Sequence, residues 1–420
     1  MPKVGRFLVT VLAIVTAACG DSGGQTSSPG PSEGKGNTSP LVIGLAVSQT
    51  GFNAAVAQEF LQGLQIWQEM VNTNTGIYAD RDHPKGLLGR QVELKFDDDQ
   101  SKAEEAAKLY EKYITSDRVD LVIPPYGSGA TGAVAQILAR HRYALVGASA
   151  ASESIYRQGL DNMVMTVPAS SLWLAALPGV MKQHSLKTAS IISLDNPFTL
   201  DSDAFLKKEF AAGGITVATS DTFASGNKDF TPIWTKVKAA SPDVVVIHAF
   251  GADSVTAMKQ AAEQKLSPKL WVFSSGAWRN DVFFDGVGPA IAECVVGDAQ
   301  WNTTVTAGGS KAFAAAYTKK YGDPLTSGTG SDPSAAWGFA GGQALTAAID
   351  NLGESALADQ QKIVDYLKSG KVKETVLGGL KPDADGINTS AHPGLFQFQE
   401  GKRVIVVGSG EPLKLCDPKG

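Results

Sequence analysis

Two successive runs of alternating apolar strands and amphipathic helices constrain the fold of this chain more than any other feature. The first run predicts strands at 41–48, 91–96, 119–123 and 143–147, with helices at 54–72, 102–115 and 130–142. The second run predicts strands at 188–194, 216–222, 244–249 and 270–274, with helices at 201–213, 229–240 and 254–264. Such alternation is typical of parallel sheets with helices on both faces. The sequence therefore predicts an α/β chain of two doubly wound parallel-sheet lobes, with ligands bound at the carboxyl ends of the strands.

The remainder of the chain adds three helices and a hairpin. The helices are predicted at 310–321, 335–352 and 360–368, and the hairpin at 394–407. A length of 420 residues with 43% hydrophobic residues suits two domains of ordinary size. The net charge of -5 gives no reason to expect a nucleic-acid partner.

The N-terminus reads as a targeting segment. Lys3 and Arg6 precede a short apolar run at 7–14, which predicts a secretory signal peptide over 1–18. Cys19 follows two alanines, an arrangement that resembles a bacterial lipobox, in which the cysteine thiol carries lipid. Ordinary signal cleavage with a free Cys19 is the alternative. Residues 19–40 are rich in Gly, Ser, Pro and Thr and predict a flexible tether.

Two further cysteines, Cys294 and Cys416, leave two readings open. An exported compartment permits a disulfide, which would join the C-terminal tail to a distant strand. Two free thiols are the alternative.

The stretch VIPPYGSGATG at 122–132 leads from a strand into a helix and is a candidate ligand-binding turn. Unpaired N–H groups at a helix N-terminus favour an anion, so the turn predicts a site for a carboxylate or another polar head group. The same stretch contains G-x-G-x-x-G, the dinucleotide fingerprint. A nucleotide is disfavoured because the motif is not on the first strand and no acidic residue ends the next one. A turn without a ligand is the other alternative.

Neither a metal site nor a catalytic site stands out. Three consecutive acidic residues end the second predicted strand, but no further ligands follow at metal-binding spacing. Ser101 and Glu104 instead predict a capping box for the next helix. The five histidines match no catalytic motif, so neither an enzyme nor a cofactor is expected. Among the histidines, His248 alone falls near the end of a predicted strand, where a ligand is expected to bind. A position in the core or at a hinge between the two lobes is the alternative for His248.

Six segments in order resemble a known family. They are VIGLAVSQTG, KGLLGRQVELKFDDDQSKAEEAAKLYEKYI, YALVGASAASESIY, GNKDFTPIWTKVKAASPDVVVI, AFAAAYTKKYGDP and the alanine-rich helix at 335–352. Together they resemble the leucine/isoleucine/valine-binding branch of the type I periplasmic binding proteins, the substrate-binding proteins of ABC importers. The resemblance implies two lobes joined by a three-crossing hinge, with the ligand in the cleft between them. It places the lobes at 41–166 with 299–378 and at 167–298 with 379–420.

The resemblance also implies ligand contacts. Those of the first lobe would be Ser128, Gly129, Thr131, Ser149, Ala150, Ala151 and Ser152. Phe198 and Phe250 stand where the family's amino-acid binders usually have tyrosines, and core packing is their alternative. Ser275 and Trp278 lie in the loop that carries the family's ammonium-pairing acid, yet this loop has no carboxylate. Asp253 or Asp281 would be a substitute.

Because a buried ammonium without an anionic partner is costly, this departure favours a ligand without one. The expected ligand is small and polar or carboxylate-bearing: a branched-chain or related amino acid, an amide, or an aromatic acid. The resemblance implies an exported, monomeric lipoprotein that is anchored to the membrane by lipid only and delivers its ligand to ABC permease subunits. A ligand-sensing receptor component without a transport role is the alternative.

Overall fold

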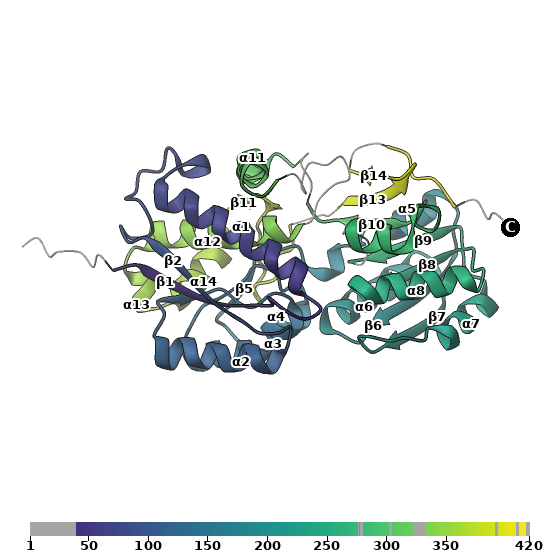
Figure 1. Ribbon diagram of the computed structural model, residues 1–420, viewed down its shortest axis with the longest axis horizontal. Coiled ribbons are helices and arrows are strands. Elements are labelled where there is room, and N and C mark those ends of the chain that lie inside the picture. The colour runs from purple at the N-terminus through teal and green to yellow at the C-terminus, as the bar shows by residue number, and fades with distance from the viewer. Residues whose placement is uncertain are drawn as a thin grey trace, which may run out of the picture. The chain divides into compact units, whose positions relative to one another are not determined.

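The computed structural model describes residues 39–275, 277, 280–301, 305–322, 333–390, 394–408 and 411–416, with only the backbone of 280 and 281. Cys19 and Trp278 lie outside these residues. The strands (Figure 1) are β1 Leu41–Val47, β2 Val92–Asp98, β3 Leu121–Val122, β4 Leu145–Gly147, β5 Met163–Met165, β6 Thr188–Leu194, β7 Thr216–Phe223, β8 Val244–His248, β9 Leu270–Ser274, β10 Val296–Ala299, β11 Glu374–Thr375, β12 Gly378–Gly379, β13 Gly394–Gln399 and β14 Lys402–Val407. The longer α-helices are α1 Ala54–Thr73, α2 Ala103–Lys112, α3 Ser128–Arg140, α5 Leu177–Gln183, α6 Pro197–Ala212, α7 Thr231–Ala240, α8 Gly251–Glu263, α11 Ser310–Tyr321, α12 Pro333–Leu352 and α14 Gln361–Lys368. Shorter α-helices are α4 Glu153–Tyr156, α9 Asp285–Val287, α10 Pro289–Ala292 and α13 Ser355–Ala358.

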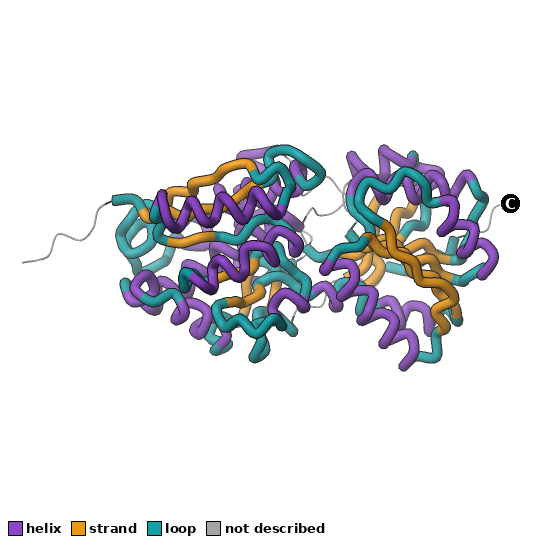
Figure 2. The backbone as a smooth tube through the Cα atoms, turned by 90° about the horizontal axis from the view of Figure 1, so that it is seen from below, coloured by secondary structure: helices purple, strands orange, loops and turns teal. Residues whose placement is uncertain are grey.

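The second run of alternation forms a seven-stranded sheet in the order β14-β13-β10-β9-β8-β6-β7. The strands from β6 to β10 pair in parallel, and the hairpin of β13 and β14 adds to β10 in antiparallel fashion. Figure 2 shows these strands in orange with helices beside them. Leu206 and Phe210 of α6 pack with the cluster on one face, whereas Trp234 of α7 and Met258 of α8 belong to the cluster on the other. Helices therefore cover both faces, and the predicted doubly wound α/β class is confirmed.

The first run differs from the prediction of one continuous sheet. It forms a three-stranded parallel sheet, β2-β1-β3, and a separate parallel pair, β4-β5. The strand β3 is only two residues long. Pro124 and Pro125 follow soon after β3 and have no N–H to donate. The strand therefore ends early and does not pair with β4.

Helices α1 and α12 pack against each other at glycines. A Cβ atom built on Gly63 of α1 would lie 1.9 Å from the carbonyl oxygen of Ala335, and one on Gly338 would lie 2.2 Å from that of Phe60. Only glycine permits the two backbones to approach this closely.

Gly63→Ala is therefore expected to lower the free energy of unfolding by about 1–3 kcal/mol, because the helices must move apart. Gly179→Ala is the matched control, since Gly179 is an exposed glycine in α5 with nothing within 4 Å of the added Cβ atom. This control should stabilise the protein by about 0.5–1 kcal/mol. Urea unfolding of both variants measures the difference, and equal effects would contradict the packing argument.

The predicted capping box before α2 is wrong. The N-cap of α2 is Lys102, without a side-chain cap hydrogen bond. The Ser101 hydroxyl donates to the carbonyl oxygen of Thr50 at 2.8 Å and accepts from the N–H of Asn53 at 3.1 Å. Ser101 thus ties the loop after β1 to the loop after β2, because both loops lie at the same edge of the sheet.

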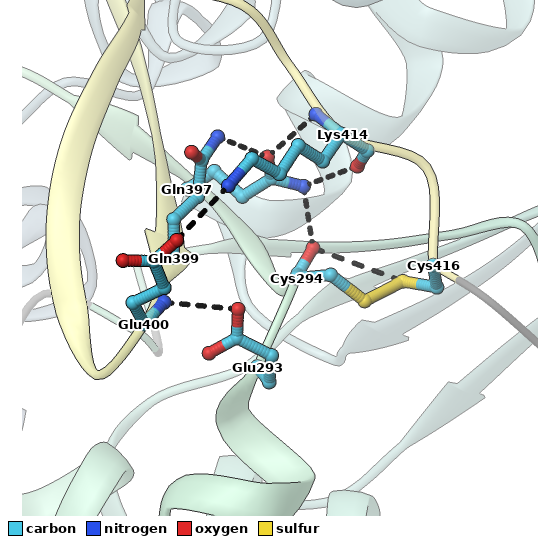
Figure 3. The surroundings of a disulfide bond; sticks show 7 residues. All are labelled: Glu293, Cys294, Gln397, Gln399, Glu400, Lys414 and Cys416. Carbon is cyan, nitrogen blue, oxygen red and sulfur yellow. Dashed lines mark hydrogen bonds and ion pairs between the residues drawn. A yellow bond between two sulfur atoms is a disulfide. The ribbon is translucent and has the colours of Figure 1, made fainter. Parts of the chain in front are cut away.

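Cys294 and Cys416 are joined by a disulfide with a Cα–Cα distance of 5.5 Å (Figure 3), so the reading of two free thiols does not hold in this structure. The tail that carries Cys416 also runs along β13, where the carboxamide of Gln397 bonds both the N–H and the carbonyl oxygen of Lys414. Side-chain amides thus hold the tail in the manner of a further strand.

The described part of the chain shows no group of His, Cys, Asp or Glu side chains arranged to hold a metal ion. Within the same residues, no helix combines the length and the apolar character needed to cross a membrane.

Candidate functional site

A cavity of about 250 Å³ is lined by loops at the carboxyl ends of strands in both main sheets. The described residues that line it are Ser48, Phe52, Asn53, Ala55, Val56, Ser101, Ala103, Tyr126, Gly127, Ser128, Gly129, Ala130, Ser149, Trp173, Asn196, Phe198, Phe250, Gly251, Ser275, Val282 and Trp337. No Asp, Glu, Lys, Arg or His is among these described residues. The cavity is the candidate ligand site.

The turn between β3 and α3 forms one wall. Its N-cap, Gly127, has a φ of 85°, a conformation that favours glycine. The Gly127 N–H donates to the Ser149 hydroxyl oxygen at 3.1 Å, which fixes the turn against the loop after β4. Helix α3 begins at Ser128, two residues earlier than predicted, and this start brings Ser128, Gly129 and Ala130 into its first turn.

Hydrogen bonds decide what each hydroxyl of this wall can offer. The Ser128 oxygen accepts from the N–H of Ser152 at 3.1 Å, so its O–H remains available as a donor. The Ser149 oxygen accepts from Gly127, and its O–H donates to the carbonyl oxygen of Pro125 at 3.3 Å. The Ser128 hydroxyl can therefore still donate a hydrogen bond, whereas the Ser149 hydroxyl can only accept one more.

A buried carboxyl group, that of Asp99, lies next to the lining residue Ser48, where β1 and β2 end. Asp99 is fully buried, and one of its oxygens accepts from the Ser48 hydroxyl at 2.6 Å and from the Ser101 N–H at 2.8 Å. Burial raises the pKa of Asp99, and these hydrogen bonds oppose the shift. Because the Ser48 hydroxyl donates its proton to Asp99, the Ser48 oxygen can only accept a hydrogen bond from a group in the cavity.

Five aromatic rings of the lining are in contact with one another. Ring centroids lie 4.5 Å apart for Trp173 and Phe198, and 5.5 Å apart for Trp173 and Trp337. The series continues from Phe198 to Phe250 at 5.8 Å and from Trp337 to Tyr126 at 6.2 Å. A flat ring of a ligand would find edges and faces to pack against on several sides.

The loops after β6 and β9 contribute the polar groups of the opposite wall. The Ser275 N–H donates to Asp298 at 2.8 Å, whereas the Ser275 hydroxyl is buried and has no hydrogen-bond partner among the residues that the structure describes. Asn196 is the N-cap of α6, and its side-chain oxygen accepts from the N–H of Phe198 at 3.0 Å. The cap explains why α6 begins at Pro197, four residues earlier than predicted, since Asn-Pro is a helix-start signal.

The structure brings some of the predicted site residues together and leaves others outside the lining. Those that line the cavity are Ser128, Gly129, Ser149, Phe198, Phe250 and Ser275. Thr131, Ala150, Ala151 and Ser152 are buried behind it, and the Thr131 hydroxyl donates to the carbonyl oxygen of Pro125 at 2.9 Å. The described lining includes neither proposed substitute acid: Asp253 binds the N–H of Gly226, and the side chain of Asp281 is not described. Ligand contact by any of these residues stays a prediction.

Several lining residues were not among the predicted ligand contacts, and three of them matter most for the chemistry of the cavity: Trp173, Trp337 and Asn196. Trp173 lies a few residues after the hinge crossing predicted near 164–168 rather than at a strand end, and Trp337 lies in a helix that is buried along most of its length. Neither gives a local signal. Asn196 does, because polar residues after a parallel strand mark the ligand edge of a sheet.

His248 is not at the cavity. It is the last residue of β8, fully buried, and neither ring nitrogen has a hydrogen-bond partner among the described residues. In the register of the sheet it lies beside Ser193 of β6 and Ser274 of β9. Burial, reinforced by the charge of Lys207, lowers the pKa of His248 to about 3.

A comparison of the whole sequence with known families agrees with this architecture. The profile of the periplasmic binding protein family matches residues 40–394. The chain belongs to this family, with the type I fold. Within it, the chain is similar to Leu/Ile/Val-binding proteins: it is 24% identical over 369 residues to BraC3 of Rhizobium johnstonii, covering 87% of this chain and 93% of that protein. It is 26% identical over 376 residues to Leu/Ile/Val-binding protein homolog 7 of Brucella abortus, covering 84% and 88%.

Solved structures share the fold. LivJ of Streptococcus pneumoniae, in complex with isoleucine, superposes with a TM-score of 0.73 at 21% identity, covering 87% of this chain and 97% of that one. A solute-binding protein of an ABC transporter from R. palustris, in complex with benzoate, superposes with a TM-score of 0.71 at 21% identity, covering 88% and 96%. The fold therefore accommodates ligands with and without an ammonium group.

Proposed function

We propose that this chain is an extracytoplasmic solute-binding protein that captures a small aromatic carboxylate and delivers it to an ABC importer. The observation that carries the proposal is a cavity lined by five aromatic rings in contact and by no charged side chain among the described residues. Solved relatives in complex with benzoate and with 4-hydroxybenzoate support the same ligand class.

The proposal includes the setting inferred from the sequence. Residues 1–18 direct export, Cys19 carries the lipid anchor and 19–40 tether the folded body. The two lobes, 41–166 with 299–378 and 167–298 with 379–420, close on the ligand, and the closed monomer is recognised by the permease. In this proposal the lobes are joined by crossings near 164–168, 295–301 and 377–383.

Aromatic acids are expected to bind the mature chain at least ~100-fold more tightly than leucine, isoleucine or valine. The reason is that burial of an ammonium without a carboxylate partner costs at least about 3 kcal/mol. Calorimetric titration with benzoate, 4-hydroxybenzoate, phenylacetate and the three amino acids measures the ratio. Phe198→Leu should weaken the binding of the aromatic acids by roughly 5–10-fold, because it removes a ring–ring contact that contributes about 1 kcal/mol.

Leucine that binds as tightly as the acids would contradict the aromatic assignment, and the ammonium would then have a partner that the described lining does not show. If none of the six compounds binds, the ligand lies outside both classes.

A further inference from the structure

Asn196 holds a side-chain amide in a fixed orientation at the cavity. Its carboxamide oxygen accepts from the N–H of Phe198 at 3.0 Å as the N-cap of α6. The oxygen is therefore committed to the helix, and the nitrogen, Nδ2, points away from that N–H. Among the described residues Nδ2 makes no hydrogen bond, although the residue is only partly exposed.

The first turn of α3 lies across the cavity from this nitrogen. A Cβ atom placed on Gly129 would lie 3.7 Å from Nδ2, with no other atom within 4 Å. The loop after β6 thus brings a donor to the N-terminus of the helix that follows β3, and both belong to the cavity lining.

Nearby groups are hydrogen-bond donors, as Nδ2 is. The Ser128 oxygen already accepts from Ser152, which leaves its O–H as a donor. The N–H groups at the start of α3 have no carbonyl partner within the helix. Ser275, which also lines the cavity, is more than nine-tenths buried, and its hydroxyl has no partner within the described part of the chain. Both walls therefore present donors to the same cavity, and a carboxylate would provide acceptors for them.

We propose that Asn196 determines the specificity of the site: its Nδ2 and the first turn of α3 together hold the carboxylate of the ligand, and they reject an ammonium group. This assignment rests on the proposed function, since it requires that the cavity is the ligand site. Asn196 is a specificity determinant because an amide and an acid at this position have the same shape but opposite preference for the charge of the head group.

The chain permits a test in which the helix cap is preserved. Aspartate and serine are both good N-cap residues, so Asn196→Asp and Asn196→Ser retain the hydrogen bond to Phe198. The first variant replaces the Nδ2 group by a negatively charged oxygen, and the second removes Nδ2 because the shorter serine side chain ends at the oxygen that caps the helix. Both should therefore keep the melting temperature of the wild type within about 2 °C, since a small change in stability shifts it only slightly in a chain of this size.

Calorimetric titration of the mature chain with benzoate, benzamide and benzylamine varies the head group on one ring. The wild type should bind benzoate most tightly and benzylamine most weakly. Asn196→Ser should weaken the binding of benzoate about 10-fold, as expected when a hydrogen bond to a charged group is lost. Asn196→Asp should weaken the binding of benzoate at least ~100-fold, because two carboxylates would then face each other in the cavity, and it should strengthen the binding of benzylamine.

The outcomes separate the two proposals. If Asn196→Asp binds benzoate within about threefold of the wild type, the role of Asn196 is overturned and the aromatic-acid function stands. If the wild type binds neither benzoate nor benzamide, the proposed function fails and the role of Asn196 fails with it. If the binding of benzoate is weakened only in variants whose melting temperature also falls, Asn196 acts as a helix cap alone.

Discussion

Replacing Cys294 and Cys416 together by serine is expected to lower the free energy of unfolding by about 3–5 kcal/mol. The disulfide closes a loop with a sequence separation of 122 residues. Chain entropy alone gives nearly 5 kcal/mol for a loop of that length, and measured effects are commonly smaller. The bond also fixes the tail to the sheet, together with the hydrogen bond from the Cys416 N–H to the carbonyl oxygen of Lys269 at 2.8 Å.

Urea unfolding of the wild type and the double variant, each with and without reductant, measures this effect. Reductant should move the wild type toward the variant and leave the variant unchanged, because the variant has no bond to lose. A control variant, Gln399→Leu, removes only the hydrogen bonds from its carboxamide to Gln397 and to Pro412 of the tail. It should cost about 1–2 kcal/mol. A double variant within 1 kcal/mol of the wild type would show that the disulfide does not stabilise the fold.

The order of helices and strands was largely predictable because it follows from local periodicity. Strand β6 has the predicted bounds of 188–194, and helix α11 those of 310–321. The division of the first sheet was not predictable in the same way. Pairing between strands is a relation through space: the two prolines after β3 indicate where this strand ends, but not with which neighbours its residues pair.

The candidate site was predictable only where it follows the rule that ligands bind at strand ends. Ser128, Ser149 and Ser275 lie in the loops or at the helix start that follow parallel strands, and they line the cavity. Trp173 and Trp337 supply much of its aromatic surface, but each approaches from a segment whose position depends on the packing of the whole chain. No periodicity or spacing within 420 residues indicates that these two rings lie 5.5 Å apart.

Acid is expected to destabilise this protein through His248, by about 3 kcal/mol at pH 4. Burial lowers the pKa of this imidazole in the folded chain to about 3, whereas in the unfolded chain it has its ordinary value near 6.5. Between these values the unfolded chain binds the additional proton. The contribution of neutral His248 is therefore fully present above about pH 6.5 and is lost progressively as the pH falls toward 3.

The neighbours of His248 determine how the experiment must be designed. Asp203 and Lys207 of α6 form an ion pair at 3.1 Å close to this end of the sheet, and the positive charge of Lys207 adds to the effect of burial on His248. Burial raises the pKa of Asp203, which favours the folded state as the pH falls and thus opposes the effect of His248. A pH profile of the wild type alone would mix these two contributions.

The difference between the wild type and His248→Gln isolates the histidine, because glutamine keeps a polar side chain but does not titrate. The two proteins should have stabilities within about 1 kcal/mol at pH 7.5, and the variant should be more stable by about 3 kcal/mol at pH 4. Urea unfolding at half-unit steps from pH 7.5 to pH 4 gives both profiles. Parallel profiles would mean that the folded protein accepts the proton on His248 without penalty. The buried row of Ser193, His248 and Ser274 would then have to hold enough water to solvate a charge.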